Sequence, residues 1–285
     1  MAFIPVAVLA LASFTSAAPS LFARQAITTL SPAQISAFKP YTFYAAAAYC
    51  FPDSTLAWNC GSANPAFQPI ASGVWYVGVD ESLATVIVGH QGTDTREILS
   101  LVTDADFFLG SLDPNLFPGL STSIEVHSGF MHEHAKTATE ILDAVQTGLT
   151  QFGVNKVTLV GHSLGGALAL LESVFLPLHL PEVTFQTIVY GMPRVGNEAF
   201  ADYASIGNTV THINNKEDFV PILPGRSLGF RHPTGEIHIQ DSGVWSFCPG
   251  QDNTNGLCTT GDVSNILEGR EGDHDGPYDG VLMDC

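Results

Sequence analysis

The chain has 285 residues, of which 45% are hydrophobic and 13% charged, and its formal net charge at pH 7 is −18. With only 10 lysines and arginines it lacks the basic surface that nucleic-acid binding requires, and its negative charge disfavours adsorption to anionic membranes. The length and the apolar content are typical of one large α/β domain with a substantial core.

The N-terminal segment has the pattern of a secretory signal. Residues 1–18 are mostly apolar and end in Thr15-Ser16-Ala17-Ala18, which predicts a cleaved signal peptide and an extracellular protein. Residues 19–30 would then be a short pro-segment or N-terminal arm, and residues 31–285 a single domain. No other apolar run reaches the length of a membrane span, so we expect no integral membrane segment.

The expected elements then alternate along the chain. A helix starts at the capping Ser31-Pro32 and continues to Tyr49, with an interruption at Lys39-Pro40. The other expected elements are, in order, a loop over 51–72, a hairpin of strands at 74–79 and 83–89, a strand end at Phe107-Phe108, a loop over 111–123, a long helix within 129–152, a strand from Val157, a helix to about Phe175 that Pro177 and Pro181 end, a strand at 183–190, a helix at 197–204, strands at 210–214 and 237–240, and loop with short helix to Cys285. This alternation indicates an α/β fold with a mostly parallel central sheet and helices on both faces.

The stretch Gly161-His162-Ser163-Leu164-Gly165-Gly166 lies between a β-branched apolar run and an Ala/Leu-rich run. This is a G-x-S-x-G pattern in its strand–turn–helix context. Such a turn holds its central residue in a strained conformation, so its close neighbours must be small. Ser163 is therefore the candidate nucleophile, and the N-terminus of the following helix points at the reaction centre.

A serine nucleophile needs a general base, and the base needs a carboxylate that fixes its tautomer. In this arrangement the acid and then the base follow the serine along the chain. Asp218 lies just past a strand end and is the candidate acid, with Glu217 as its rival. The candidate bases are His274, in a late loop, and His232, whereas His238 lies inside a strand pattern and is expected to be structural.

The charge that develops on an attacked carbonyl oxygen must be met by hydrogen-bond donors. One donor is expected to be the backbone N–H of Leu164, directly after the nucleophile. The other should follow an earlier strand, where Gln91-Gly92-Thr93 forms a glycine-containing turn. We therefore expect the N–H of Thr93, together with its hydroxyl, to complete the oxyanion hole.

Five cysteines in a secreted chain predict disulfides with one thiol left over. Cys248 and Cys258 enclose a polar loop and are natural partners. For the remaining three we favour Cys50–Cys285, which ties the C-terminal segment to the first helix and leaves Cys60 free. Cys50–Cys60 stays open as the alternative pairing.

The triplet His132-Glu133-His134 invites interpretation as a metal site. It lacks the H-E-x-x-H spacing, and alternate residues on a helix face apart, so a solvated helix face is the expected role. We expect no metal and no cofactor.

Together these motifs resemble the fungal class 3 (filamentous-fungal) triacylglycerol lipases. The resemblance extends from about Ala45 to Cys285 and rests on Tyr49-Cys50, Gly92-Thr93, Val126-His127-Ser128-Gly129-Phe130, the serine motif at 161–166, Tyr190-Gly191-Met192-Pro193-Arg194-Val195-Gly196-Asn197 and Asp218-Phe219-Val220-Pro221. It implies an α/β-hydrolase fold, a triad of Ser163, Asp218 and His274, and oxyanion donors at Thr93 and Leu164. It also implies that His232 is a non-catalytic family histidine and that Cys50–Cys285 matches a family disulfide.

The resemblance further implies a short helical lid after the oxyanion turn, over residues 94–104. Ile98, Leu101 and Val102 fall on one helical face with Leu99 nearby, and such a face can cover the serine in water and turn toward oil. A fixed helix packed on the core is the alternative.

The implied activity is a secreted serine-ester hydrolase that cleaves acylglycerols through an acyl-enzyme on Ser163. Its implied partner is a lipid or ester substrate at an oil–water interface. The apolar lid face favours a lipid ester over the aryl esters that a feruloyl-type esterase cleaves, but that enzyme or a general carboxylesterase remains the alternative. A non-catalytic secreted binding protein on the same scaffold is the alternative outside the enzymes.

Overall fold

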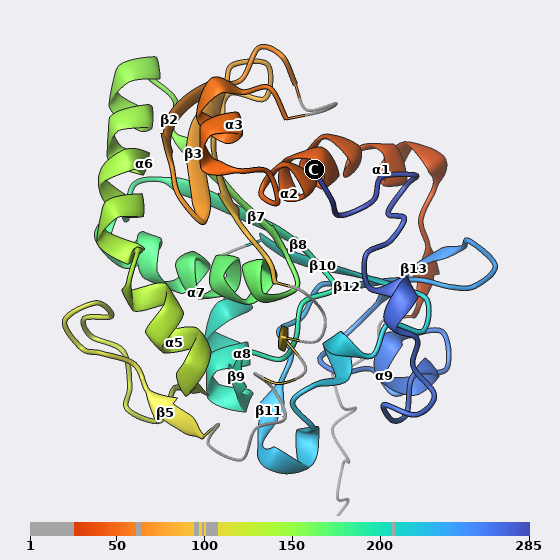
Figure 1. Ribbon diagram of the computed structural model, residues 1–285. Helices are drawn as coiled ribbons and strands as arrows, with labels where there is room; N and C mark the ends of the chain where they lie inside the picture. The colour runs from red at the N-terminus through yellow and green to blue at the C-terminus, as the bar shows by residue number, and fades with distance from the viewer. Residues whose placement is uncertain (1–25, 61–63, 94–96, 99, 101–107, 207–208) are drawn as a thin grey trace, which may run out of the picture.

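The computed structural model describes residues 26–60, 64–93, 97–98, 100, 108–206 and 209–285 (Figure 1). The expected signal peptide, most of the 19–30 arm and Phe107 lie outside the described residues. The strands are β1 (Thr28–Thr29), β2 (Gln68–Ser72), β3 (Trp75–Asp80), β4 (Thr85–His90), β5 (Leu109–Ser111), β6 (Glu125–His127), β7 (Lys156–His162), β8 (Thr184–Tyr190), β9 (Gly196–Asn197), β10 (Thr209–Asn215), β11 (Phe230–Arg231), β12 (Glu236–Ile239) and β13 (Trp245–Cys248). The helices are α1 (Pro32–Ser36), α2 (Lys39–Ala47), α3 (Pro52–Ala57), α5 (Ser128–Ala135), α6 (Ala138–Phe152), α7 (Leu164–His179), α8 (Glu198–Ala204), α9 (Thr259–Asp262) and the 3₁₀ turns η1 (Val220–Ile222), η2 (Arg226–Leu228) and η3 (Glu271–Asp273).

A nine-stranded sheet forms the centre of the described structure, in the order β1-β13-β12-β10-β8-β7-β4-β3-β2. The strands from β12 to β4 are parallel. Antiparallel strands complete both edges, with β3 and β2 beside β4, and β13 and β1 beside β12. The mostly parallel central sheet expected from the sequence is confirmed. A smaller antiparallel sheet, in the order β11-β9-β6-β5, lies apart from it.

Helices cover both faces of the large sheet (Figure 1). Helices α6 and α7 contact β3, β4, β7 and β8 on one face, while α2 contacts β4, β7 and β8 on the other. The alternation of side chains along β4 divides the core accordingly: Val86 and Val88 pack on the α6–α7 side, and Ile87 between them packs on the α2 side. The carboxyl ends of β4, β7 and β10 therefore meet at one edge of a sheet that is buried on both faces.

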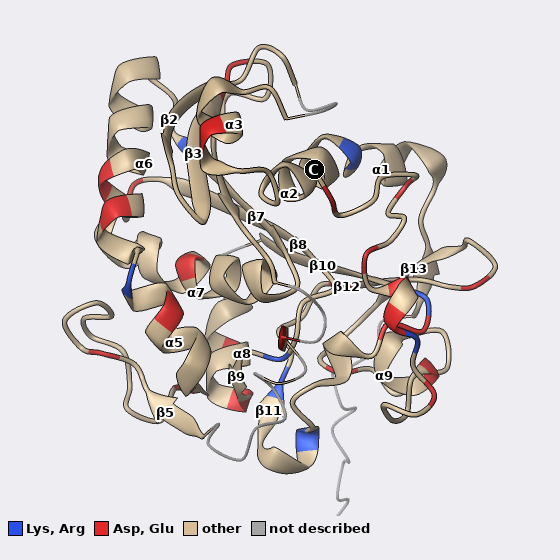
Figure 2. Cartoon of the chain, viewed as in Figure 1, with Lys and Arg blue, Asp and Glu red and all other residues tan. Residues whose placement is uncertain are grey.

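The surface is acidic, as the composition requires. Figure 2 shows acidic residues spread over outer helices, including α3, α5 and α6, with few basic residues among them. Within the described part of the chain, no helix combines the length and the hydropathy needed to cross a bilayer.

The loop expected over 51–72 is wrong, because this stretch contains α3 and β2. Pro52 starts α3 because its fixed φ suits the first turn, and Trp58 ends the helix in a left-handed conformation (φ 47°). β2 then pairs with β3 at the edge of the sheet, where Pro69 is tolerated beside a register shift. The Pro/Asn/Gly composition of the segment concealed both elements.

The long helix expected within 129–152 is confirmed as α6, and the same stretch also contains most of α5. α5 ends at Ala135, where Lys136 and Thr137 donate to carbonyls three residues back, and α6 starts at Ala138.

The helix that was expected to end near Phe175 is longer, because α7 runs through Pro177 to His179. The helical hydrogen bonds continue beyond the proline, because the N–H of Leu180 donates to the Leu176 carbonyl at 2.8 Å.

The segment after β12 was expected to be loop with a short helix, but it also contains a strand. β13 pairs with β12 as an antiparallel hairpin and with β1 on its other side. The pairing with β1 joins Thr28 to Phe247, and no local pattern in the sequence indicates such a distant partner.

Replacing Leu170, which is fully buried in α7, with alanine should lower the free energy of unfolding by about 2–5 kcal/mol, because the substitution leaves a cavity in the core. The matched control is Leu267→Ala, since Leu267 is 97% exposed and its loss should change stability by less than about 0.5 kcal/mol. Chemical denaturation of both variants measures the difference. Equal stabilities would contradict the packing described here.

Candidate active site

Ser163 joins β7 to α7 in a strained backbone conformation, with φ 57° and ψ −126°. The turn is so tight that a Cβ at position 161 would lie 2.3 Å from the Gly165 carbonyl oxygen. A Cβ at position 165 would lie 2.2 Å from the carbonyl oxygen of His90. Both glycines are therefore required by backbone contact, and the hydroxyl of Ser163 is held at the sheet edge beside the end of β4.

Asp218 and His274 form a buried pair. Nδ1 of His274 donates to Oδ2 of Asp218 at 2.8 Å, and the two side chains are 1% and 0% exposed. Asp218 follows β10, and its other carboxylate oxygen accepts a hydrogen bond from the Val220 N–H at 2.9 Å. A carboxylate in this position fixes the tautomer of the imidazole and stabilises its protonated form.

The rival residues have other partners. Glu217 forms an ion pair with Arg270, with Oε2 and Nε 2.6 Å apart. His232 donates from Nε2 to the Pro221 carbonyl at 2.7 Å, and His238 lies between the carbonyls of Leu257 and Lys216. The structure thus joins Asp218 to His274 and gives His232 and His238 backbone contacts.

Two reactive atoms of this site have no hydrogen-bond partner within the described residues. They are Oγ of Ser163 and Nε2 of His274, the ring nitrogen opposite the carboxylate, and both are buried. A nucleophile, a base with a free nitrogen and an orienting carboxylate are the parts that acyl transfer requires.

The two expected oxyanion donors lie together. Thr93 and Leu164 line the same cavity of about 170 Å³. Leu164 is the first residue of α7, and Oγ1 of Thr93 is buried without a partner in the described structure. The expected donors therefore converge from the ends of β4 and β7, next to the positive end of a helix dipole.

The ring of His162, directly before Ser163, connects two parts of the site. Its Nε2 donates to the His274 carbonyl at 2.8 Å, and its Nδ1 accepts from the Tyr49 hydroxyl at 2.6 Å. Burial, with a smaller effect of His274, lowers the pKa of His162 well below 6.5, so its ring is neutral. The hydroxyl of Tyr49 would also lie 2.1 Å from a Cβ at position 92, so the same tyrosine packs against the oxyanion turn.

Sequence reasoning did not assign these supporting contacts. His162 is not a candidate base because it adjoins the serine, but its ring is hydrogen-bonded to the loop that carries His274. Tyr278 donates to the His274 carbonyl at 3.0 Å, and Asn215 donates to the Asp273 carbonyl at 2.9 Å. The sequence feature that pointed to the contact of Tyr49 was the Tyr49-Cys50 pair. It contributed to the family resemblance, but it had no expected role in the site.

The lid is described only in part. Ile98 is fully buried, whereas Leu99, Leu101 and Val102 lie outside the described residues. The helical lid over residues 94–104 therefore stays a prediction.

The structure contains the Cys50–Cys285 and Cys248–Cys258 disulfides, and Cys60 is a buried free thiol. The favoured pairing is thus the one present, and the Cys50–Cys60 alternative is wrong for this structure. Among the described residues, Glu236, Cys248 and Cys258 cluster closely enough to suggest a metal site, but both cysteines are consumed by the disulfide.

The solvated face expected for His132-Glu133-His134 is wrong for His134. His132 is exposed, but His134 is 1% exposed and its Nε2 lies 3.4 Å from Oε1 of the fully buried Glu172. α5 packs against α7, and the rings of Phe117 and Phe175 contact His134. A buried pair between two helices leaves no local pattern, because each partner alone resembles a surface residue.

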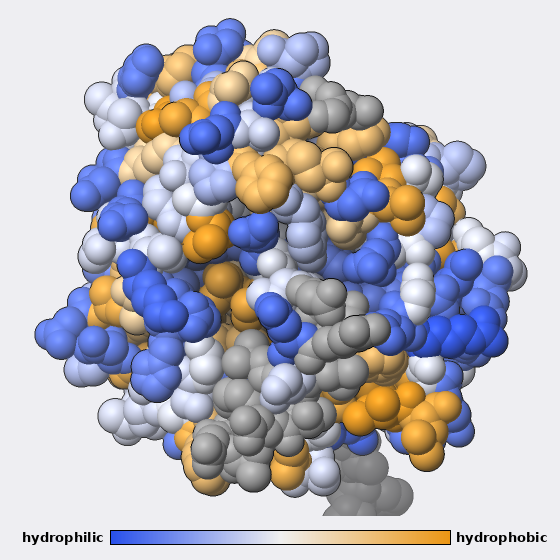
Figure 3. Space-filling model, in the orientation of Figure 1, coloured by the Kyte–Doolittle hydropathy of each residue, from blue (hydrophilic) through white to orange (hydrophobic). Residues whose placement is uncertain are grey.

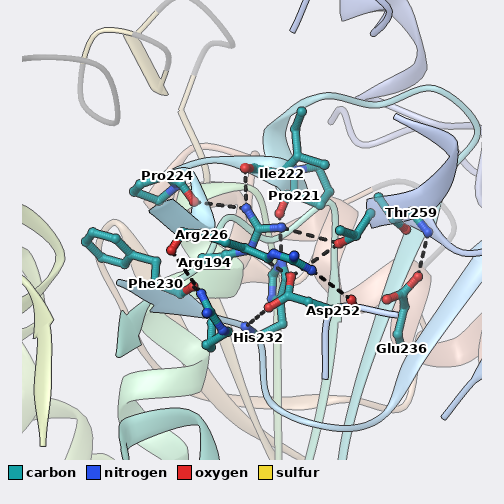
Figure 4. A network of polar contacts seen from close by, with 12 residues as sticks. Arg194, Pro221, Ile222, Pro224, Arg226, Phe230, His232, Glu236, Asp252 and Thr259 are labelled. Atoms are coloured by element: carbon teal, nitrogen blue, oxygen red, sulfur yellow. Dashed lines mark hydrogen bonds and ion pairs between the residues drawn. The ribbon is translucent and has the colours of Figure 1, made fainter. Parts of the chain in front are cut away.

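A second buried network holds the loop that begins at Asp218 (Figure 4). Nη1 of Arg194 donates to the carbonyls of Ile222 and Pro224, its backbone N–H donates to Leu223, and His232 donates to Pro221. The four consecutive carbonyls of residues 221–224 thus accept hydrogen bonds from only two residues, Arg194 and His232. Asp252 anchors both donors, since it accepts from Nε of Arg194 at 2.7 Å and from the backbone N–H of His232 at 3.1 Å.

The family model for Lipase (class 3) matches residues 87–228. A secreted mono- and diacylglycerol lipase of Malassezia globosa is 31% identical over 230 residues, which cover 79% of this chain and 72% of that protein. Lipase II from Rhizopus niveus aligns with a TM-score of 0.76 and 28% identity, covering 90% of this chain and 98% of its own. A triacylglycerol lipase whose catalytic centre is formed by a serine protease triad aligns with a TM-score of 0.77, 27% identity and the same coverage of 90% and 98%.

Tyr49→Phe should slow the reaction of Ser163 with an organophosphate by about tenfold, because His162 loses the donor that fixes its tautomer and the base loop loses order. The labelling rate, followed by mass spectrometry, measures the effect. Tyr203→Phe, on α8, is the matched control. An unchanged rate in the Tyr49 variant would show that the contact does not support the base.

Acid should destabilise the fold through its buried histidines. Burial lowers the pKa of His212 to about 3 and that of His232 to about 4. At pH values between these and about 6.5, the two histidines bind more protons in the unfolded chain than in the folded one. Their contribution to stability is therefore complete above about pH 6.5. Below it the free energy of unfolding falls by up to about 1.4 kcal/mol per pH unit for each histidine.

Denaturant unfolding at pH 7, 6 and 5 measures this slope, and His232→Gln should make it shallower. A stability that stays constant over this range would contradict the assignment of neutral, buried imidazoles.

Proposed function

Because this chain belongs to the class 3 lipase family and has its α/β-hydrolase fold, we propose that it is a secreted serine-ester hydrolase that cleaves acylglycerols. The observation that carries the proposal is the buried Asp218–His274 pair beside a strained Ser163, with a free ring nitrogen on the base. The secreted relative from Malassezia globosa and the apolar N-terminal segment support an extracellular enzyme.

The proposed reaction begins when Oγ of Ser163 attacks the ester carbonyl and Nε2 of His274 takes its proton. Asp218 stabilises the imidazolium, and the N–H groups of Thr93 and Leu164 stabilise the oxyanion. The tetrahedral intermediate collapses as His274 returns the proton to the leaving alcohol, and an acyl-enzyme remains on Ser163. Water then attacks with His274 as base, and the fatty acid leaves.

Two side chains hold the loop that carries the proposed base. His162 and Tyr278 both donate to the His274 carbonyl, so the base loop stays fixed while its ring exchanges protons. This preorganisation supports transition-state binding, because little reorganisation is needed at the moment of reaction.

The substrate is proposed to be a lipid ester presented at an oil–water interface. The buried Ile98 supports an apolar inner face of the proposed lid. Relative rates on acylglycerols of increasing chain length and on feruloyl esters distinguish this proposal from a feruloyl-type or general carboxylesterase. A non-catalytic binding protein on this scaffold would hydrolyse neither class.

Ser163→Ala should abolish hydrolysis of a p-nitrophenyl ester, with a loss of at least about 10³-fold, because no other group can form the acyl-enzyme. His274→Ala should have a similar effect, whereas His232→Ala should retain turnover in the fraction that folds. Circular dichroism checks the folding of every variant, and active-site titration of His232→Ala corrects its rate for the folded fraction. Turnover retained in Ser163→Ala, or lost only in His232→Ala, would overturn the assignment.

A further inference from the structure

Asp252 lies in the surface loop that the Cys248–Cys258 disulfide closes. Among residues 249–257, all of which the structure describes, it alone is buried, with 4% of its surface exposed. Hydrophilic side chains cover much of the right-hand side of Figure 3, beside the position of α9, the helix that follows this loop in Figure 1. A carboxylate is among the groups least often buried in proteins, so its burial in a surface loop requires specific partners inside the protein.

Those partners are Arg194 and His232, the two residues that donate to the carbonyls of residues 221–224 (Figure 4). Oδ1 of Asp252 accepts from Nε of Arg194 at 2.7 Å and from the Thr260 hydroxyl at 3.2 Å. Its Oδ2 accepts from the backbone N–H of His232 at 3.1 Å. Burial by itself would raise the pKa of Asp252, but His232 and Arg194, with their hydrogen bonds, hold it below its usual value of 3.8. The carboxylate is therefore ionised at neutral pH, and the Arg194 guanidinium compensates its charge.

The carbonyls held by Arg194 and His232 belong to the backbone that sets the direction of the Asp218 carboxylate. Oδ1 of Asp218 accepts from the N–H of Val220, the first residue of η1, at 2.9 Å. Its Oδ2 accepts from Nδ1 of His274 at 2.8 Å. A shift of η1 would move the Val220 N–H and turn the carboxylate relative to the imidazole. The Asp218–His274 hydrogen bond therefore depends on how firmly η1 is held.

The ion pair of Asp252 and Arg194 is better explained by orientation than by stability. Both side chains are buried, and the free-energy cost of burying two charges can exceed the gain from their attraction. A guanidinium, however, has its donors fixed in one plane. With Nε held by Asp252, Nη1 of Arg194 points to the carbonyls of Ile222 and Pro224, which are the last residue of η1 and a residue just beyond it.

We propose that Asp252 is a positioning residue for the proposed acid, Asp218. Asp252 fixes η1 through Arg194 and His232. η1 in turn holds the Asp218 carboxylate against the imidazole of His274. The inference rests on the proposed function, because it concerns the acid of the proposed triad. Since Asp252 acts through the backbone of another loop, its loss should slow the chemical step and leave the groups that touch the substrate in place.

Asp252→Asn tests this role with little change of shape. An asparagine side chain accepts only through its single oxygen, so Nε of Arg194 or the N–H of His232 loses its acceptor, and the guanidinium loses its counter-charge. The kcat for p-nitrophenyl butyrate, per active site titrated with an organophosphate, should fall about 10- to 100-fold, as expected when a catalytic group is slightly misplaced. KM should stay within about twofold, because acylation and deacylation use the same base.

The matched control is Asp80→Asn, the same substitution at another buried aspartate. Asp80 is 1% exposed and accepts hydrogen bonds from the Tyr44 hydroxyl and the Ser82 N–H. It pairs with Thr85 at the start of β4, whereas the candidate site lies at the other end of that strand. The control should lose stability through its own broken hydrogen bonds, but it should keep the wild-type kcat per active site.

Proton NMR follows the hydrogen bond itself. The Nδ1 proton of His274, held by the Asp218 carboxylate, is expected far downfield in the spectrum of the wild-type protein. This resonance should shift or broaden in Asp252→Asn and keep its position in Asp80→Asn.

Thr260→Val is a milder second variant, which decides the question where Asp252→Asn does not fold. It removes the hydroxyl that donates to Asp252 at 3.2 Å and accepts from Nη2 of Arg194 at 3.3 Å. We expect kcat per active site to fall about two- to fivefold with KM unchanged, as for the loss of one hydrogen bond.

The outcomes separate the two proposals. An unchanged kcat per active site in the folded variants, or an equal loss in Asp80→Asn, would overturn the positioning role and leave the esterase proposal intact. A wild-type protein that neither hydrolyses the ester nor forms the organophosphate adduct would overturn the proposed function itself.

Discussion

The backbone contact around Ser163 is the constraint on which the site depends. A φ of 57° is unfavourable for a residue with a side chain, so it persists only where the surroundings allow nothing else. The carbonyls of Gly165 and His90 lie where side chains at positions 161 and 165 would have to be. β4, β7 and α7 are thus in direct backbone contact, and the end of β4 that leads to Thr93 is fixed relative to the nucleophile.

The placement of the proposed base, His274, and of the proposed acid, Asp218, depends on a second set of contacts, which comes from distant segments. His162, Tyr278 and Asn215 hold the backbone of the loop that carries His274. Arg194 and His232 hold the carbonyls that follow Asp218. Each catalytic candidate is therefore placed by main-chain hydrogen bonds from its neighbours, which leaves its reactive atoms free for chemistry.

The sequence was sufficient where the signal is local. The strand–turn–helix around Ser163 and the strand before Asp218 predicted the sheet edge, since periodicity and glycine spacing report local backbone demands. It was insufficient where partners are distant: the pairing of β1 with β13 and the buried His134–Glu172 pair arise from tertiary packing. The contact between Tyr49 and His162 likewise depends on how α2 crosses β7.

The Cys50–Cys285 disulfide joins residues separated by 235 positions, and Ser163, Asp218 and His274 all lie within the loop that it closes. Outside the cell, exposed loops are where proteases cut first. A single cut inside this ring separates no fragment from the rest, because both pieces remain covalently attached through the bridge. The bridge and the packing of the core can then keep Ser163, Asp218 and His274 together in a nicked chain, so a first cleavage need not end the proposed activity.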